Sequence, residues 1–460
     1  MGKERENLKS RLGFLFLAAG CAIGLGNVWR FPFIAGKYGG GAFVLLYIFF
    51  LLAVGLPILV MELAIGRAAR RGIVGAYRDL EKMAPTRFRW EIPGMVFFTG
   101  NLLLMMFYTT ISGWLLAYTV RYCLCMEMTD SVQIFREMSS STGGNLVAMG
   151  SVVLLATLIC SAGLRNGIER TTKWMMSLLL LLLLVLCGVA VTLPGGMEGV
   201  KFLLLPDFDK LFDAGTGEAV IAALGQAFFT LGIGVGSMAI FGSYIDRQHS
   251  LSKEGIWIIV LDTGVAILAG LLIFPICFSF PGPDGPVLDS GPSLIFVTLP
   301  KLFEVMQFGS VFGAAFFLFL TIAAMTTVVA VFENLIAFLI DEWHMNRKVA
   351  SLLNGVVIFI LSIPCALGFG ALSCVQPLGE GSTILDFEDF LVSENLLPLG
   401  ALYLLCFCVF RYGWGWQNFL NEANAGEGVK FPACLGGYLR WILPVVILAV
   451  LINGYIARFF

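Results

Sequence analysis

Long apolar stretches recur from one end of the sequence to the other, and this feature limits the possible folds most strongly. A helix needs about 20 apolar residues to cross roughly 30 Å of hydrocarbon. Only 13% of the 460 residues are charged, about half of the usual share in a soluble domain. We therefore expect an all-α, polytopic membrane protein with eleven transmembrane helices. Their expected positions are 12–35, 41–66, 91–122, 146–163, 170–193, 218–246, 255–279, 306–341, 349–370, 386–410 and 436–457.

Basic residues are concentrated in alternate loops, which predicts how the chain is oriented. Arginine and lysine are frequent before the first segment and in the loop at 67–89, whereas the loops at 282–291 and 376–389 are acidic or neutral. By the positive-inside rule the N-terminus is cytoplasmic, and eleven crossings place the C-terminus outside the cell membrane. A net charge of −2 does not suggest a nucleic-acid partner. The lipid bilayer is the expected surrounding, and the sequence does not indicate an oligomeric state.

Glycines interrupt two of the apolar segments at corresponding positions. GLG lies at 24–26 in the first segment, and GIGVG lies at 232–236 in the sixth. The two are five segments apart, which predicts a 5+5 inverted repeat, with residues 12–193 and 218–410 as the repeats, 436–457 as an extra helix and 1–460 as one domain. Glycine also serves close helix packing, and that alternative fits either break alone. The matched pair favours two unwound helices that form a binding site at the middle of the bilayer.

Unwound helices have a definite chemistry at membrane depth. Their bare carbonyl groups need a substitute for water, and a desolvated Na⁺ can provide it because it is a hard cation that prefers oxygen ligands. The positive N-terminal end of the half-helix after each break suits a carboxylate. The sequence therefore predicts a site for a small solute that carries an anionic group, with sodium bound beside it. Arg30 follows the first break and can close over what is bound.

Three stretches resemble a known family. RLGFLFLAAGCAIGLGNVWRFPFIAGKYGGGAF at 11–43 strongly resembles the first helix of the neurotransmitter:sodium symporters, in their bacterial amino-acid branch. FFTLGIGVGSMAIFGSYI at 228–245 resembles the sixth helix of that family, and IAAMTTVVAVFENLIAFLIDE at 322–342 the eighth. The resemblance covers essentially the whole chain and implies alternating access in a transporter. It departs at the end, because many members have twelve helices.

The resemblance implies two sodium sites. The first would use Ala22, Asn27, Thr230 and Asp262 together with the carboxylate of the substrate. The second would use the carbonyl groups of Gly20, Ile23 and Ala323 and the hydroxyl groups of Thr326 and Thr327. The spacing of the last three residues places them on one helical face. Threonines in membrane helices also bond back to the carbonyl at i−4, which is an alternative role for this pair.

The resemblance also indicates the substrate class. Monoamine carriers of the family have an Asp where this chain has Gly24, so the substrate here should bring its own carboxylate, as an α-amino acid does. Its amino group would meet carbonyls near the breaks, at Ala22, Phe229 and Thr230, and its carboxylate would meet Tyr108, the backbone at Gly26 and sodium. The side-chain pocket would consist of Leu104, Tyr108, Phe229, Gly232, Val235, Val328 and Val331. These residues are apolar, and two are small, which favours a hydrophobic or aromatic L-amino acid.

Asp262 lies deep in a span, where an ionised carboxylate is costly unless it is compensated. Chloride-independent members of the family carry an acidic side chain near this place, so we expect transport without chloride. A purely structural hydrogen bond is the alternative, and a proton on the returning carrier is a second hypothesis for the same residue. The competing function is a chloride-dependent sodium symporter of a non-α-amino acid or osmolyte. An enzyme is not expected, because no nucleophile with a base and no metal-ligand set lies at membrane depth.

Alternating access predicts two gates. Arg30 and Asp389 would pair on the outer side above Tyr108 and Phe229. Arg5 and Asp341 would pair on the inner side, near Ser243 and Tyr244. Each pair could also consist of ordinary interfacial charges. Leu8 stands where the family usually has Trp, and for Glu62 both a solvated helix-end role and a hinge-capping role are open.

Overall fold

The computed structural model describes residues 8, 10–83, 88–126, 130–213, 215–280 and 292–459, and side chains as far as residue 456. Within these ranges the chain is helical, and the only β-type pairs are two isolated bridges, Gly40 with Pro206 and His249 with Glu427. The prediction of an all-α fold is confirmed.

Nine helical stretches in the described part of the chain are long and apolar enough to cross a membrane, and the pair Arg11–Ala22 and Gly26–Lys37, bent by 57°, makes a tenth if it is one span. The nine are Gly41–Ala69 (α3, η2, α4), Glu91–Cys123 (α6, α7), Thr142–Ser161 (α9), Leu164–Val191 (η4, α10), Leu251–Ser279 (α15), Gly309–Trp343 (α17), Arg347–Leu367 (α18), Ile384–Val409 (α19, η6, α20) and Ala433–Ile456 (within η7, η8 and α22). Two shorter apolar helices, α13 (Thr216–Leu231) and α14 (Ser237–Gly242), form the segment predicted at 218–246.

Several helices lie between the apolar ones. They are α5 (Ile73–Leu80), α8 (Ser131–Ser140), α11 (Gly196–Leu204), α12 (Phe208–Asp213), α16 (Leu299–Val305) and α21 (Trp416–Ala423). Hydropathy does not detect such short helices, because none of them has an apolar run long enough to cross a membrane.

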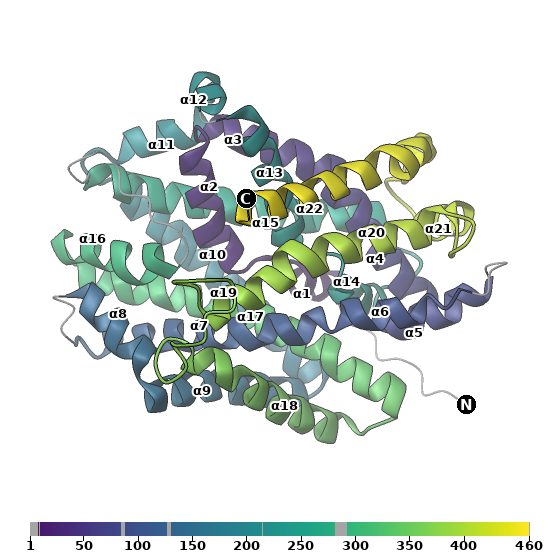
Figure 1. The fold of residues 1–460 in the computed structure, drawn as a ribbon, viewed down its shortest axis with the longest axis horizontal. Helices are drawn as coiled ribbons and strands as arrows, with labels where there is room; N and C mark the ends of the chain where they lie inside the picture. The colour runs from purple at the N-terminus through teal and green to yellow at the C-terminus, as the bar shows by residue number, and fades with distance from the viewer. Residues whose placement is uncertain are drawn as a thin grey trace.

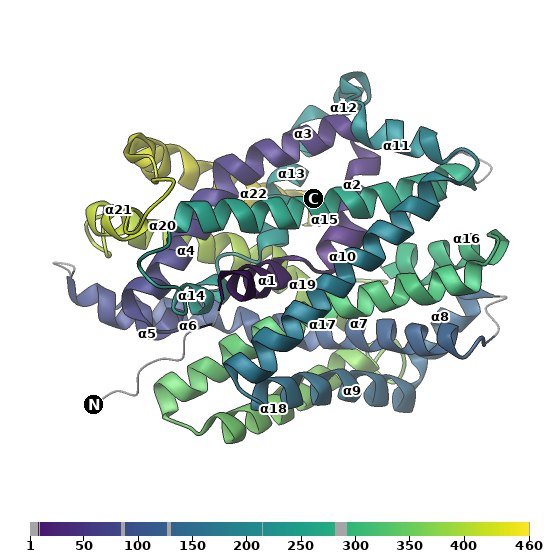
Figure 2. The same ribbon diagram turned by 180° about the vertical axis from the view of Figure 1, so that it is seen from behind.

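The helices surround a buried centre. Figures 1 and 2 show α1 (Arg11–Ala22) and α14 in the interior, with α17 and α7 (Gly100–Cys123) running beside them and α9 and α18 paired at one edge. The most apolar window of α17 is 78% buried, whereas that of the last helix is only 22% buried. The interior position of α17 therefore brings its side chains to the two short half-helices at the centre.

Glycines allow the half-helix α14 to lie directly against α4 (Leu56–Ala69). A Cβ atom at Gly66 would be 1.7 Å from the carbonyl oxygen of Ala239, and one at Gly242 would be 2.2 Å from that of Leu63. Close backbone packing of this kind is common between membrane helices with small residues at the contact. It attaches α14 firmly to α4, which matters for the site below.

Candidate substrate and ion site

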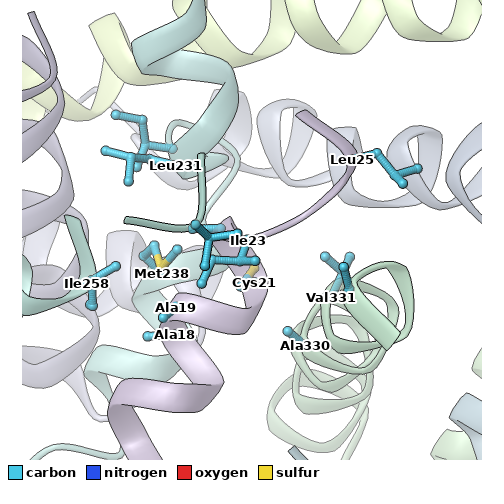
Figure 3. Packing of buried hydrophobic residues seen from close by; sticks show 14 of the residues in the cluster. Ala18, Ala19, Cys21, Ile23, Leu25, Leu231, Met238, Ile258, Ala330 and Val331 are labelled. Carbon is cyan, nitrogen blue, oxygen red and sulfur yellow. The ribbon is translucent and has the colours of Figure 1, made fainter. Parts of the chain in front are cut away.

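The first helix is interrupted where its glycines predict. α1 ends at Ala22, Ile23 is extended (ψ 99°), and the chain becomes helical again in η1 (Gly26–Arg30) and α2 (Phe31–Lys37). Figure 3 shows Ile23 and Leu25 on this non-helical stretch, opposite Val331 of α17. The backbone groups at the break are thereby released from helical hydrogen bonding and face the interior.

The sixth segment is interrupted as well. α13 ends at Leu231 and α14 begins at Ser237. Between them Gly232, Gly234 and Gly236 have φ angles of +56°, +107° and +85°, a region that glycine enters without steric cost. Both predicted breaks are confirmed.

Glu62 of α4 caps the second break. Its carboxylate is fully buried and accepts hydrogen bonds from the backbone N–H groups of Gly234 and Met238, each at 3.0 Å. The interruption of the helix leaves these N–H groups without helical partners, and an unpaired buried N–H group costs free energy. Of the two roles left open by the sequence, the structure supports the hinge-capping one.

A cavity lies between the two breaks. Its volume is only about 50 Å³, so it is tightly lined. Its lining residues are Cys21, Ala22, Gly24, Leu25, Gly26, Leu104, Tyr108, Phe229, Thr230, Gly232, Val235, Ser237, Thr327, Val331, Val392 and Leu397. Every predicted substrate-contacting residue is among them except Val328. Val328 is fully buried and lies about 100° around the helix from Thr327, and its contact with a substrate stays a prediction.

Two of the residues predicted for the first sodium site, Asn27 and Thr230, meet Asp262 of α15. The third, Ala22, lines the cavity. The carboxylate of Asp262 is fully buried and accepts hydrogen bonds from Asn27 Nδ2 at 2.9 Å and from Thr230 Oγ1 at 2.9 Å. Asn27 Oδ1 in turn accepts from the N–H of Gly24 at 3.2 Å. Tyr47, which the sequence analysis missed, donates to the same carboxylate at 3.4 Å. This tyrosine is one hydroxyl in an apolar run, and a polar atom at that depth is the signal that could have identified it.

The residues predicted for the second sodium site also meet. Thr327 Oγ1 is 3.2 Å from the carbonyl oxygen of Gly20, 3.3 Å from that of Ile23 and 3.5 Å from that of Ala323. Thr326 Oγ1 donates to the Ala323 carbonyl at 2.8 Å, at i−3. Three carbonyl and two hydroxyl oxygens thus converge without an acidic side chain. Neutral oxygen ligands suit a hard monovalent cation. Within the described residues no group of three or more His, Cys, Asp and Glu side chains could hold a metal ion.

The outer gate differs from the expectation. The guanidinium carbon of Arg30 lies 4.5 Å from the ring centroid of Phe229, and Asp389 accepts a hydrogen bond from Ser393 Oγ at 2.5 Å. Among the described residues no ion pair joins Arg30 to Asp389 in this conformation, and their pairing as a gate stays a prediction. Arg30 is instead stacked on Phe229, an aromatic residue of the cavity lining, and a sequence cannot reveal this contact because it depends on side-chain rotamers.

The inner side is described in part. Asp341 Oδ2 accepts from the N–H of Gly72 at 3.1 Å, and Tyr244 donates to the buried Glu333 at 2.6 Å. Ser243 is buried and donates to the carbonyl of Ile240 at 2.5 Å. Arg5, the predicted partner of Asp341, lies outside the described residues.

Comparison with known proteins agrees with this geometry. The model of the sodium:neurotransmitter symporter family matches residues 5–130 and 128–458. The chain is 36% identical over 450 residues to the sodium-dependent transporter YhdH of Bacillus subtilis, covering 96% of both chains. It is 26% identical to the sodium- and chloride-dependent GABA transporter 2 of Mus musculus, over 98% of this chain and 80% of that one. The crystal structure of MhsT in complex with L-phenylalanine is similar with a TM-score of 0.83 and 35% identity, covering 97% of this chain and 99% of MhsT.

Proposed function

Because this chain belongs to the sodium:neurotransmitter symporter family of sodium-dependent transporters, we propose that it carries a hydrophobic or aromatic L-amino acid into the cell together with sodium. It is a transporter and not an enzyme. The observation that carries the proposed substrate class is the contact between Gly24 and Tyr108. A Cβ atom at Gly24 would be 2.6 Å from Tyr108 Oη, so the site has no room for a carboxylate of its own there.

The substrate must then supply the anionic group. Tyr108 Oη accepts from the N–H of Leu25 at 3.3 Å and can donate its own proton to a carboxylate in the cavity. The rest of the lining is largely apolar, with Leu104, Val235 and Val331 available to a hydrophobic side chain. Recognition of L-phenylalanine by MhsT, at 35% identity, supports the same class of substrate here.

Two sodium ions would be bound beside the amino acid. The first would lie among Ala22, Asn27, Thr230 and Asp262 and share the substrate carboxylate, and the second would lie among the oxygens around Thr327. A sodium ion that moves down about 100 mV releases about 2.3 kcal/mol. A tenfold concentration gradient adds about 1.4 kcal/mol. Two ions together therefore supply about 7 kcal/mol, which is sufficient for about 10⁵-fold accumulation of a zwitterion.

Asp262 would make chloride unnecessary. It is a fixed negative charge held by Asn27, Thr230 and Tyr47, and it would balance the cation bound beside it. With sodium and substrate released, the same buried carboxylate would be left uncompensated and would take up a proton for the return step. Proton counter-transport is therefore the mechanism we favour for resetting the carrier.

The proposed architecture has eleven crossings in a single domain, arranged as a 5+5 inverted repeat of residues 12–193 and 218–410, with an extra last helix. The N-terminus would be cytoplasmic and the C-terminus outside. Arg30, with Phe229 and Tyr108 below it, would close the outer side, and Asp389 would join that gate when the vestibule opens or closes. Arg5, Asp341, Ser243 and Tyr244 would form the inner gate.

A competition panel tests the proposal. Purified protein in detergent is incubated with radiolabelled L-phenylalanine and an excess of each of the twenty amino acids. The experiment is run in sodium chloride, sodium gluconate and N-methylglucamine chloride. We expect competition by aromatic and large aliphatic L-amino acids, equal binding in both sodium salts and none without sodium. Displacement by charged amino acids alone would contradict the proposed substrate class.

The relatives described as sodium- and chloride-dependent GABA transporters favour a second candidate, a chloride-dependent carrier of a non-α-amino acid or osmolyte. In the same panel that candidate requires binding in sodium chloride and loss of binding in sodium gluconate. It also requires sodium-dependent binding of labelled γ-aminobutyrate or betaine, which are added to the panel.

A further inference from the structure

One face of α7 meets both broken helices. Asn101, Leu104 and Tyr108 are three and seven residues apart, so they lie along the same side of the helix. Tyr108 accepts from the backbone of the first break, and Leu104 lines the cavity. Asn101 lies two turns from Tyr108, at the second break, and the mechanism above does not use it.

Asn101 is fully buried and its amide is satisfied on both sides. Its Nδ2 donates to the carbonyl of Val235 at 2.8 Å and to that of Phe98 at 3.0 Å. Its Oδ1 accepts from Ser237 Oγ at 2.7 Å. An amide is one of few side chains that can donate to a carbonyl and accept from a hydroxyl at once.

Both residues that Asn101 holds in the sixth segment line the cavity. Val235 and Ser237 lie on either side of Gly236, in the non-helical stretch and at the start of α14. Such a stretch has no helical hydrogen bonds to fix it, so its position depends on groups from other helices. Gly100 contributes to the fit, because a Cβ atom there would be 2.7 Å from Val235 Cγ1.

Glu62 and Asn101 form hydrogen bonds with different groups of the second break. Glu62, on α4, takes the N–H groups of Gly234 and Met238, whereas Asn101, on α7, takes the carbonyl of Val235 and the hydroxyl of Ser237. The two residues come from different helices and hold the segment from different sides. Only the Asn101 contacts act directly on residues whose side chains face the substrate.

We propose that Asn101 is a positioning residue that sets the side-chain selectivity of the cavity, because its amide fixes the wall formed by Val235 and Ser237. This inference rests on the proposed function. Without the amide the wall can move, so amino acids with large and small side chains are discriminated less. Asn101 has no hydrogen bond to a residue of either sodium site, so the affinity for sodium should not change.

The test compares apparent Kd values for L-leucine and L-phenylalanine in purified, full-length protein. Asn101→Leu keeps the approximate size of the side chain and removes all three hydrogen bonds. We expect the ratio of the two Kd values to move toward one by about five- to tenfold. Ser237→Ala, which removes one of the three bonds, should move the ratio in the same direction by about two- to threefold. With the amino acid held at the same multiple of each protein's Kd, the sodium concentration that gives half-maximal binding should stay within about twofold of that of the unmodified protein.

Asn145→Leu is the matched control. Asn145 is also buried and makes three hydrogen bonds, to Trp114, Ser139 and Ala366, but it does not line the cavity. This variant should lower the thermal midpoint and leave the Kd ratio unchanged.

The inference would be overturned if Asn101→Leu weakened the binding of L-leucine and L-phenylalanine equally. It would also be overturned if Asn145→Leu changed the ratio of the two Kd values as much as Asn101→Leu does. If Asn101→Leu does not fold, the ratio for Ser237→Ala decides. A lack of sodium-dependent binding in the unmodified protein would contradict the proposed function instead.

Discussion

Removing the hydroxyl group of Thr327 is the most informative single change for the proposed second sodium site. Thr327→Val keeps the β-branched shape and exchanges a hydroxyl for a methyl group, so the packing of α17 against α1 should persist. The three carbonyls of Gly20, Ile23 and Ala323 lie within 3.5 Å of that hydroxyl oxygen. The variant therefore removes one ligand from the second sodium site without altering the others.

The expected magnitude follows from the charge of the ion. A hydrogen bond or polar contact to a charged group contributes about 1.5–3 kcal/mol, against about 0.5–1.5 kcal/mol for a neutral pair. Each 1.4 kcal/mol is tenfold in affinity. The apparent affinity for sodium should therefore fall about ten- to hundredfold, and the affinity for the amino acid at saturating sodium should change much less.

The assay is L-phenylalanine binding to purified protein as a function of sodium concentration at constant ionic strength. Thr321→Val is the control on the same helix. The Thr321 hydroxyl forms a hydrogen bond with the Thr119 hydroxyl at 2.8 Å and belongs to neither proposed sodium site. The control should retain the sodium dependence of the unmodified protein. An unchanged sodium midpoint in Thr327→Val would refute the assignment of this cluster as a cation site.

Three further variants test other parts of the account. Gly24→Ala places a methyl group 2.6 Å from Tyr108 Oη. Overpacking of about 1–3 kcal/mol should weaken amino-acid binding about five- to hundredfold in the competition assay. An unchanged affinity would contradict the tight contact. Asp262→Ser should make binding require chloride, which a comparison of chloride with gluconate checks; equal binding in both salts would contradict the fixed-anion role. Glu62→Gln offers one acceptor oxygen where the N–H groups of Gly234 and Met238 both need a partner, so the thermal midpoint of unfolding should fall. Tryptophan fluorescence measures this midpoint. An unchanged midpoint would exclude Glu62 as the cap of the second break.

The breaks could be predicted from the residue pattern, whereas the residues of the two sodium sites and of the side-chain pocket were implied by the resemblance to the family. Clustered glycines, a buried Asp262 and paired threonines conflict with an apolar helical pattern, and such conflicts mark functional sites. The helical period then brings Thr327 and Val331 to one face. The same period places Val328 about 100° away from Thr327, outside the cavity lining.

Other features depend on tertiary structure and could not be predicted. Asn101 is an ordinary residue within its segment until another helix brings polar groups to it. The Tyr47 hydroxyl stands out in an apolar run, but its partner Asp262 is set only by the packing of the helices. The stacking of Arg30 on Phe229 depends on rotamers of two long side chains. The short helices between the crossings, such as α5 and α21, are stabilised by packing on the bundle and have no apolar run of their own.

The central claim is that two interrupted helices hold an amino acid and sodium in one shared site. Isothermal titration or equilibrium dialysis of L-phenylalanine across a range of sodium concentrations, with the reverse titration of sodium at fixed amino acid, tests it most directly. Ligands that share a carboxylate must raise each other's affinity by the same factor. We predict strong, equal coupling in both directions. Binding of the amino acid with the same Kd in sodium and in N-methylglucamine would contradict the account.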